Sequence, residues 1–263
     1  IQITNDDGET WVKVSEFPEV PEYTYVSDIL PSQYDENVVY ATFNNIKSDD
    51  FTPYVLRSDD QGKTWVSIAS DLPKNEAVHT IAQDPVEQNL LFVGTEMGFY
   101  FTVNGGVQWI KLGSGLPDIA VRDIAIQERE KDLVIATFGR GFYILDDYSS
   151  LRDVTEEVIE NSNAIIFPIK NAKMFIKSGN GRYGTGSGYY QAQNPDFGAV
   201  FTYYLKDVPK SLKSQRLKKE KIKISIGHKK QNINKATIVV VSSAIKKNNP
   251  ELIEAKKKTV ASL

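Results

Sequence analysis

The chain has 263 residues, of which 41% are hydrophobic, 11% aromatic and 25% charged, so it can bury a core and is neither disordered nor collagen-like. It holds no cysteine and only two histidines, His79 and His228, which excludes disulfides and thiolate chemistry and predicts no metal site and no cofactor. No apolar run is long enough for a membrane span. The net charge of −3 divides unevenly, because residues 1–150 hold 25 acidic and 10 basic residues whereas residues 151–263 hold 9 and 21.

A turn motif recurs along the first part of the chain. The pattern Ser/Thr-x-Asp-x-Gly-x-Thr-Trp occupies residues 4–11 and 58–65, and a weaker copy with Asn and Gln substituted occupies residues 102–109. An Asp at the third position of a turn can accept backbone N–H groups, Gly supplies a positive φ, and Trp can pack between sheets. We therefore predict a structural role, and not a catalytic one, for Asp6, Gly8, Trp11, Asp60, Gly62, Trp65, Asn104, Gly106 and Trp109.

Three strand-like runs recur in a fixed order along the repeat, and a shorter strand-like run follows the Trp of each turn. Together they predict a unit of four strands with a period of about 43 to 52 residues, which is typical of a β-propeller blade. The predicted fold is all-β, with four-stranded blades that form an incomplete propeller, followed by a partial β-rich module. The three longer runs lie at 26–31, 38–43 and 54–57, then at 78–82, 90–95 and 99–101, and then at 121–126, 133–138 and 142–145.

The pattern changes after residue 147. Residues 149–161 read as a short helix or turn, and residues 163–169 read as a strand that could supply the missing fourth strand of the last blade. We predict blades over residues 1–170, a linker and the start of a β-sandwich-type module over 171–212, and a Lys-rich, partly ordered tail over 213–263. The tail has no aromatic residue after Tyr204 that could stack on bases, so no nucleic-acid partner is expected.

The residues that carry the repeat also carry a resemblance. The three turns, together with residues 37–45, 71–73, 91–101, 136–147 and 194–206, resemble bacterial sortilin-like Asp-box (BNR-repeat) β-propeller proteins, which are often labelled glycosyl hydrolases. The resemblance covers roughly residues 1–212. It implies a C-terminal piece of a longer protein that is extracellular, periplasmic or at the cell surface, with the missing N-terminal blades of its own parent chain as one partner.

Candidate functional residues lie in the loops and strand starts that a propeller gathers around its channel, on the face opposite the Asp turns. The predicted ligand-binding residues are Arg140, Arg122, His79, Asn44 and Asn45. Arg140 stands between two glycines that allow close approach to its backbone, which suits an anionic or peptide ligand. The plainer interpretation is that His79 and Arg122 only form ion pairs at the channel mouth.

Two functions follow as hypotheses. The first is a binding propeller for a protein, peptide or glycan. The alternative is a glycoside hydrolase, which would need two carboxylates at a fixed separation, with Glu96 and either Asp49 or Asp50 as candidates. A neuraminidase would also need an arginine cluster, which Arg57, Arg122 and Arg140 do not assemble. The predicted discriminating feature is a carboxylate pair that faces across a cleft.

Overall fold

The structure is a computed structural model of the full chain. It describes residues 1–172, 174, 197–207, 212, 215, 231, 238–239, 248–257 and 261–262. The contacts divide the chain into two compact units, residues 1–206 and 207–263, and each is described by itself. The glycine-rich segment at 178–188 lies outside the described residues. The domain boundaries at residues 170 and 212 stay predictions.

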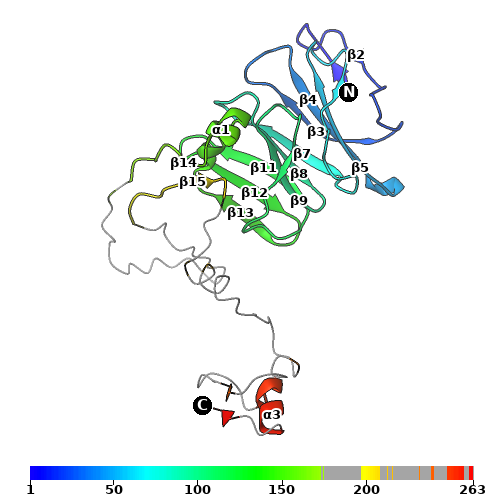
Figure 1. The fold of residues 1–263 in the computed structure, drawn as a ribbon. Coiled ribbons are helices and arrows are strands. Elements are labelled where there is room, and N and C mark those ends of the chain that lie inside the picture. The colour runs from blue at the N-terminus through cyan, green and yellow to red at the C-terminus, as the bar shows by residue number, and fades with distance from the viewer. Residues whose placement is uncertain are drawn as a thin grey trace, which may run out of the picture. The chain divides into compact units, whose positions relative to one another are not determined.

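Three antiparallel sheets follow one another in the first unit (Figure 1). The first sheet has β3 (Tyr25–Pro31), β4 (Val39–Asn45), β5 (Asp50–Ser58) and β6 (Val66–Ser67); the second has β7 (Val78–Gln83), β8 (Leu91–Thr95), β9 (Gly98–Thr102) and β10 (Ile110–Lys111); the third has β11 (Val121–Gln127), β12 (Asp132–Thr137) and β13 (Gly141–Leu145). Each strand pairs with its neighbour in the sequence, as blades require. The predicted all-β fold of propeller blades is confirmed, although the sheets of the described residues do not close into a ring.

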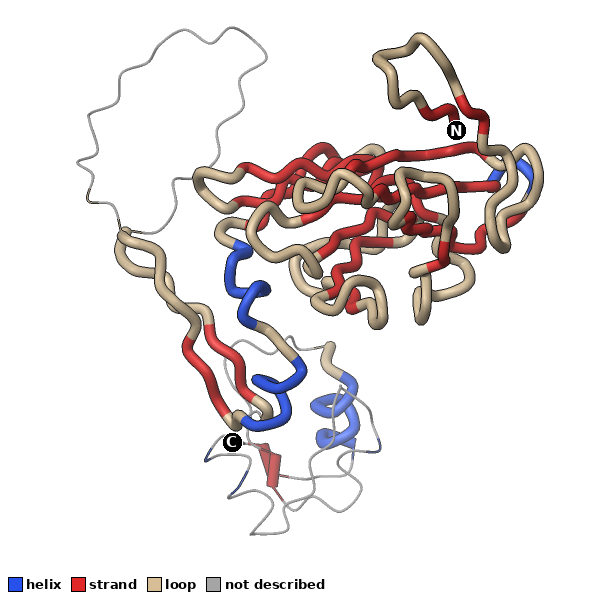
Figure 2. The backbone as a smooth tube through the Cα atoms, turned by 90° about the horizontal axis from the view of Figure 1, so that it is seen from above, coloured by secondary structure: helices blue, strands red, loops and turns tan. Residues whose placement is uncertain are grey.

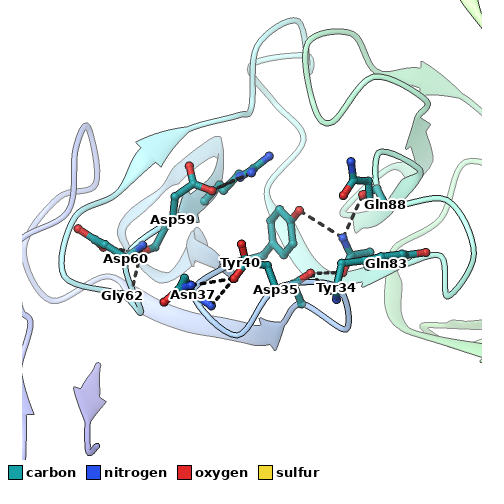
Figure 3. A network of polar contacts seen from close by, with 12 residues as sticks. Tyr34, Asp35, Asn37, Tyr40, Asp59, Asp60, Gly62, Gln83 and Gln88 are labelled. Carbon is teal, nitrogen blue, oxygen red and sulfur yellow. Dashed lines mark hydrogen bonds and ion pairs between the residues drawn. The ribbon is translucent and has the colours of Figure 1, made fainter.

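Apolar side chains fill the spaces between successive sheets, because each sheet alternates its side chains between two faces. Val55 of the first sheet packs with Val93 and Tyr100 of the second. Phe92 and Phe99 of the second sheet pack in turn with residues of the third. Polar side chains seal the first of these junctions, where the Gln83 amide contacts the Tyr40 hydroxyl at 3.4 Å and the carbonyl of Gln88 at 3.0 Å (Figure 3).

The Asp turns have the geometry that their sequence predicts. The carboxylate of Asp60 accepts hydrogen bonds from the backbone N–H and the hydroxyl of Thr64, and these bonds lower the pKa of Asp60 to about 2. Gly62 has a φ of +83°, and its carbonyl accepts the indole N–H of Trp65, which is 6% exposed. Asp6 makes the same bonds to Thr10, in a hairpin of β1 (Gln2–Ile3) and β2 (Val12–Lys13).

The three tryptophans differ in their surroundings. Trp109 is also buried, but its indole donates to the carbonyl of Ile68 and not to its own turn, where Asn104 replaces Asp. Trp11 is exposed, because among the described residues no sheet packs over the hairpin that carries it. Gly8 and Gly106 have positive φ, as Gly62 does. Burial of the Trp therefore depends on a neighbouring sheet and not on the turn alone.

The segment after the third sheet corrects one expectation. It contains the 3-10 helix η2 (Tyr148–Asp153), the helix α1 (Glu156–Asn161), β14 (Ala164–Ile166) and β15 (Tyr203–Leu205). A further 3-10 helix, η1 (Ile46–Ser48), connects β4 and β5 of the first sheet. β14 pairs with β15 and not with β13, so it does not complete the third sheet (Figure 2). Among the described residues the third sheet keeps three strands.

The second unit contains both strands and a helix. β16 (Ile238–Val239) pairs in parallel with β17 (Ala261–Ser262), and α3 (Pro250–Lys257) lies between them in the sequence. The Asn249 side chain caps α3 by accepting the N–H of Glu251 at 2.8 Å, and Pro250 suits the first helical position. Parallel strands joined through a helix form a crossover unit, which an antiparallel sandwich lacks. Among the described residues no helix is long and apolar enough to cross a membrane.

Candidate functional site

A β-bulge occurs at the same position in the first strand of each of the three sheets β3–β6, β7–β10 and β11–β13. The register shifts between Val26 and Asp28, between Val78 and Thr80, and between Val121 and Asp123. The residues in the bulges are Ser27, His79 and Arg122, which the repeat places at equivalent positions. Because a bulged residue is left out of the ladder, its side chain can be aimed away from the sheet faces.

Four of the predicted site residues meet around the bulged residues His79 and Arg122. The Nε2 atom of His79 lies 2.8 Å from the carboxylate of Glu96. Its Nδ1 atom lies 3.1 Å from Nη1 of Arg122 and 3.4 Å from the amide nitrogen of Asn44. Nη2 of Arg122 also lies 3.5 Å from the Glu96 carboxylate. The first sheet supplies Asn44, the second supplies His79 and Glu96, and the third supplies Arg122. The cluster therefore joins all three sheets.

The partners of His79 indicate a neutral imidazole. Arg122 and Asn44 can only donate through the nitrogens that face Nδ1, so Nδ1 accepts and the ring proton sits on Nε2, where it is donated to Glu96. Burial of the ring and the charge of Arg122 lower the pKa of His79, although the bond to Glu96 opposes them. Both ring nitrogens are engaged and the residue is 6% exposed. The ring therefore has no free nitrogen with which to act as a general base on a solute.

The arginines of the predicted site do not converge. The guanidinium carbon of Arg122 lies 5.4 Å from the centroid of the exposed Phe138 ring, in a cation–π arrangement that sequence reasoning missed. Arg140 is exposed in the turn before β13, between Gly139 and Gly141, which both have positive φ. The contacts of the described residues do not bring it into the His79 cluster.

The loop that carries the other carboxylates forms its own network. The carboxylate of Asp50 accepts from the Asn45 amide at 3.2 Å, from the Tyr54 hydroxyl at 2.8 Å and from the Thr52 backbone N–H. Burial acts to raise the pKa of Asp50, but these hydrogen bonds outweigh it and lower the pKa. Asp49 caps η1 in a left-handed conformation with φ of 61°. An ionised Asp50 cannot serve as a general acid, and no carboxylate pair with Glu96 is formed in the described contacts.

Two buried carboxylates were missed by sequence reasoning. Glu76 accepts from the Tyr100 hydroxyl at 3.0 Å and from the Thr95 hydroxyl, and burial together with Glu76 raises the pKa of Tyr100. Asp84 is fully buried and binds Arg152 of η2 at 2.8 Å as well as the Tyr148 hydroxyl at 2.6 Å. Both sets of partners are satisfied within the fold, so we assign them to stability.

No group of three or more metal-ligating side chains occurs in the part of the chain that the structure describes. The ligand-binding role of the predicted residues remains a prediction for Arg140, Arg122, His79, Asn44 and Asn45. Three of them, Arg122, His79 and Asn44, meet in one cluster together with Glu96.

Comparison with known proteins finds similarity in the second unit. Residues 206–262 match the family model of the Mur ligase family, catalytic domain. The UDP-N-acetylmuramate–L-alanine ligase of Pelagibacter ubique is 77% identical over 44 residues, which are 17% of this chain and 10% of that enzyme. The ligase of the same name from Sinorhizobium fredii is 56% identical over 52 residues, 20% of this chain and 11% of that enzyme. The chain thus spans about a tenth of the length of these relatives.

Solved structures resemble the chain only loosely. The GH74 enzyme of Niastella koreensis has a TM-score of 0.38 at 19% identity, over 46% of this chain and 21% of that one. YCF48 bound to D1 peptide has a TM-score of 0.41 at 15% identity, over 56% of this chain and 44% of that one. Scores this low carry no argument about function.

These findings correct the function expected from the sequence. The resemblance to sortilin-like Asp-box proteins is wrong as a family assignment, because the family that matches is that of the Mur ligases. The binding propeller and the glycoside hydrolase are contradicted for the same reason, as are the secreted class and the extracellular, periplasmic or cell-surface location. The error arose because the functional prediction rested on the turn motif of the first part of the chain, whereas the Lys-rich tail contained no motif that we recognised.

Proposed function

We propose that residues 206–262 contribute part of the catalytic domain of a UDP-N-acetylmuramate–L-alanine ligase, and that the protein acts in joining these two substrates. The observation that carries the proposal is the 77% identity over 44 residues to the Pelagibacter enzyme. Such identity exceeds what a solvated tail of biased composition would retain by composition alone. The proposal concerns the contribution of this segment, because the chain spans about a tenth of the ligase.

The local structure of the second unit supports the proposal. β16, α3 and β17 form a strand–helix–strand unit with parallel strands. In open α/β sheets, ligands bind outside the carboxyl ends of parallel strands. A buried Ala255 on α3 and the Asn249 cap give the unit a defined helix at one side. A segment of this kind suits the substrate-binding sheet of an enzyme better than it suits a linker.

A segment exchange tests the proposal. Residues 206–262 replace their counterpart in the Pelagibacter ligase, and amide formation is measured with UDP-N-acetylmuramate, radiolabelled L-alanine and ATP. We expect turnover within about tenfold of the parent enzyme, which corresponds to about 1.4 kcal/mol in the barrier. The matched control carries Ala255→Glu, which places a carboxylate at the buried position of α3 and should abolish turnover by unfolding the segment.

Circular dichroism of the exchanged enzyme decides how a negative result is read. An exchanged ligase that folds as the parent does and yet forms no amide product would contradict the proposal. The 263-residue chain is assayed in parallel, and we expect it to form no amide product by itself.

A further inference from the structure

The strand registers align the three sheets position by position. In each sheet, one residue from each of the first three strands lies in a row on the same face, namely the face toward the next sheet in the sequence. We call this the forward face. The rows are Asp28–Thr42–Val55 in the first sheet, Thr80–Gly94–Phe99 in the second and Asp123–Ala136–Phe142 in the third.

Exposure of the equivalent residues changes abruptly at the third sheet. Val55 is 0% exposed and Phe99 is 1% exposed, because the next sheet covers each of them. Phe142 stands at the same position and is 75% exposed. Ile144 is 60% exposed, whereas its counterpart Phe101 is 7% exposed. A forward face that is buried at both inner junctions is therefore open on the third sheet, with large apolar side chains in place.

A carboxylate shows what kind of surface covers this face. Asp28 accepts the N–H of Ile29 through one oxygen, and through the other it accepts the Thr80 hydroxyl at 2.9 Å and the Ile81 N–H at 3.0 Å. The second oxygen thus holds the first strand of the following sheet.

Asp123 repeats the first half of this arrangement. One of its oxygens accepts the N–H of Ile124 at 2.9 Å, as Asp28 does with Ile29. Among the described residues, its other oxygen has no hydrogen-bond partner. The third sheet therefore presents the acceptor that, at the junction of the first and second sheets, takes a hydroxyl and a backbone N–H from the next strand.

We propose that the forward face of the third sheet is a docking surface for a four-stranded blade that lies outside residues 1–263, and that the first strand of this blade carries Ser or Thr at the position of Thr80. The hydroxyl and the following N–H bind Asp123. The apolar face of the blade covers Phe142 and Ile144. The small side chain of Ala136 permits close approach, as Gly94 does where Val121 packs against it.

The described part of this chain does not supply that blade. After β13 the chain enters η2, where Tyr148 packs edge-on against Phe92 and binds Asp84 of the second sheet. Residues 146–263 contain no further copy of the turn motif.

A second copy of the chain does not fit either. Its first strand would present Asp28 where Thr80 stands, which would set two carboxylates against each other. The N-terminal segment also covers part of its first sheet, where the Phe17 ring lies 5.8 Å from the Trp65 ring. Charge thus favours a partner blade with a hydroxyl at this position.

The test uses the full chain and a separate peptide of residues 71–112, which is the second sheet with Thr80 in place. Hydrogen exchange of residues 141–145 and a binding titration are measured. We expect slower exchange on addition of the peptide. Phe142→Glu in the chain and Thr80→Asp in the peptide should each weaken binding by about tenfold or more, since each places an unpaired charge in the contact. Val66→Glu, on an exposed position of the first sheet, is the control that should change nothing.

A second arm guards against a peptide that does not fold. The same residues 71–112 are inserted after Asp147 through a flexible linker, and the exchange of residues 141–145 is measured again. Absence of protection in both arms overturns the proposal. Binding that Phe142→Glu leaves unchanged also overturns it. Sedimentation that shows a dimer of the unmodified chain, dissociated by Phe142→Glu, would assign the face to a second copy and would overturn it too.

Discussion

The second and third sheets are built on one pattern but stand in opposite surroundings. Each has a bulge in its first strand, a small residue in its second and a phenylalanine in its third, at equivalent positions. Among the described residues, the second sheet is covered on both faces, whereas the third is covered on one. The pair teaches that the repeat specifies the strands, and that burial depends on the neighbour each sheet receives. Four predictions test this comparison.

The largest expected difference lies between Phe99→Ala and Phe142→Ala. Phe99 is buried between two sheets, so its truncation should lower the free energy of unfolding by about 3–5 kcal/mol. Phe142 is exposed, and its truncation should change that free energy by no more than about 0.5 kcal/mol. Urea unfolding of the two variants measures both values. Equal losses would mean that the third sheet is covered in solution.

The small residue of the second strand gives the next difference. A Cβ at Gly94 would lie 2.6 Å from Cγ1 and 2.7 Å from the carbonyl oxygen of Val121, and the backbone oxygen cannot move away freely. Gly94→Ala should therefore cost about 1–3 kcal/mol in the same unfolding experiment. Ala136→Ser, at the equivalent position of the open face, should cost less than about 0.5 kcal/mol. A Gly94→Ala variant with unchanged stability would mean that the two sheets do not approach as closely as described.

Loss of the Thr80 hydroxyl, which donates to Asp28, should have a smaller effect on the free energy of unfolding. Thr80→Val removes the hydroxyl that Asp28 accepts, and should cost about 0.5–1.5 kcal/mol because the carboxylate keeps the Ile81 N–H. Asp123→Asn on the open face keeps an acceptor for Ile124 and should be nearly neutral. Thermal unfolding of both variants is the measurement. The comparison fails if Asp123→Asn proves the more costly of the two.

The pH dependence is the smallest expected effect. The pKa of His79 is lowered in the folded protein, so the unfolded chain binds the proton first as the pH falls. Stability from this group is complete above about pH 6.5 and is lost below it, by at most about 1.4 kcal/mol for each pH unit. His79→Asn should flatten the dependence between pH 7 and pH 5. Unfolding titrations at fixed pH values check this, and parallel curves for the two proteins would contradict it.

The sequence predicted the blades because their signals are local. Strands at 38–43 and 90–95 follow from alternation and from turn residues within reach of one another, and Asp60 and Trp65 act through neighbours four and three residues away. Strand pairing over longer distances was predicted less well. The strand at 164–166 pairs with Tyr203–Leu205 across a long separation, and nothing in its own residues distinguishes this partner from β13.

The candidate site was predicted in part. Alignment of the repeats placed His79 and Arg122 at one position, and the structure brings them together with Asn44 and Glu96. The alignment could not show that the bonds among these groups use both nitrogens of the imidazole, because that depends on three sheets at once. Asp84 and Arg152 could not be paired from the sequence either, since they stand 68 residues apart. The predicted function was wrong for another reason, because the Lys-rich tail was assessed from its composition alone.

The way in which strands pair in the three sheets also bears on how the chain folds. Every strand from β3 to β13 pairs with a strand adjacent to it in the sequence, so each hairpin closes a short loop at little entropic cost. Proteins rich in such local contacts fold quickly. The link between Asp84 and Arg152 and the pairing of β14 with β15 both close much longer loops. We therefore expect the sheets to form early, and the contact of η2 with Asp84 and the pairing of β14 with β15 to form in a later and slower phase.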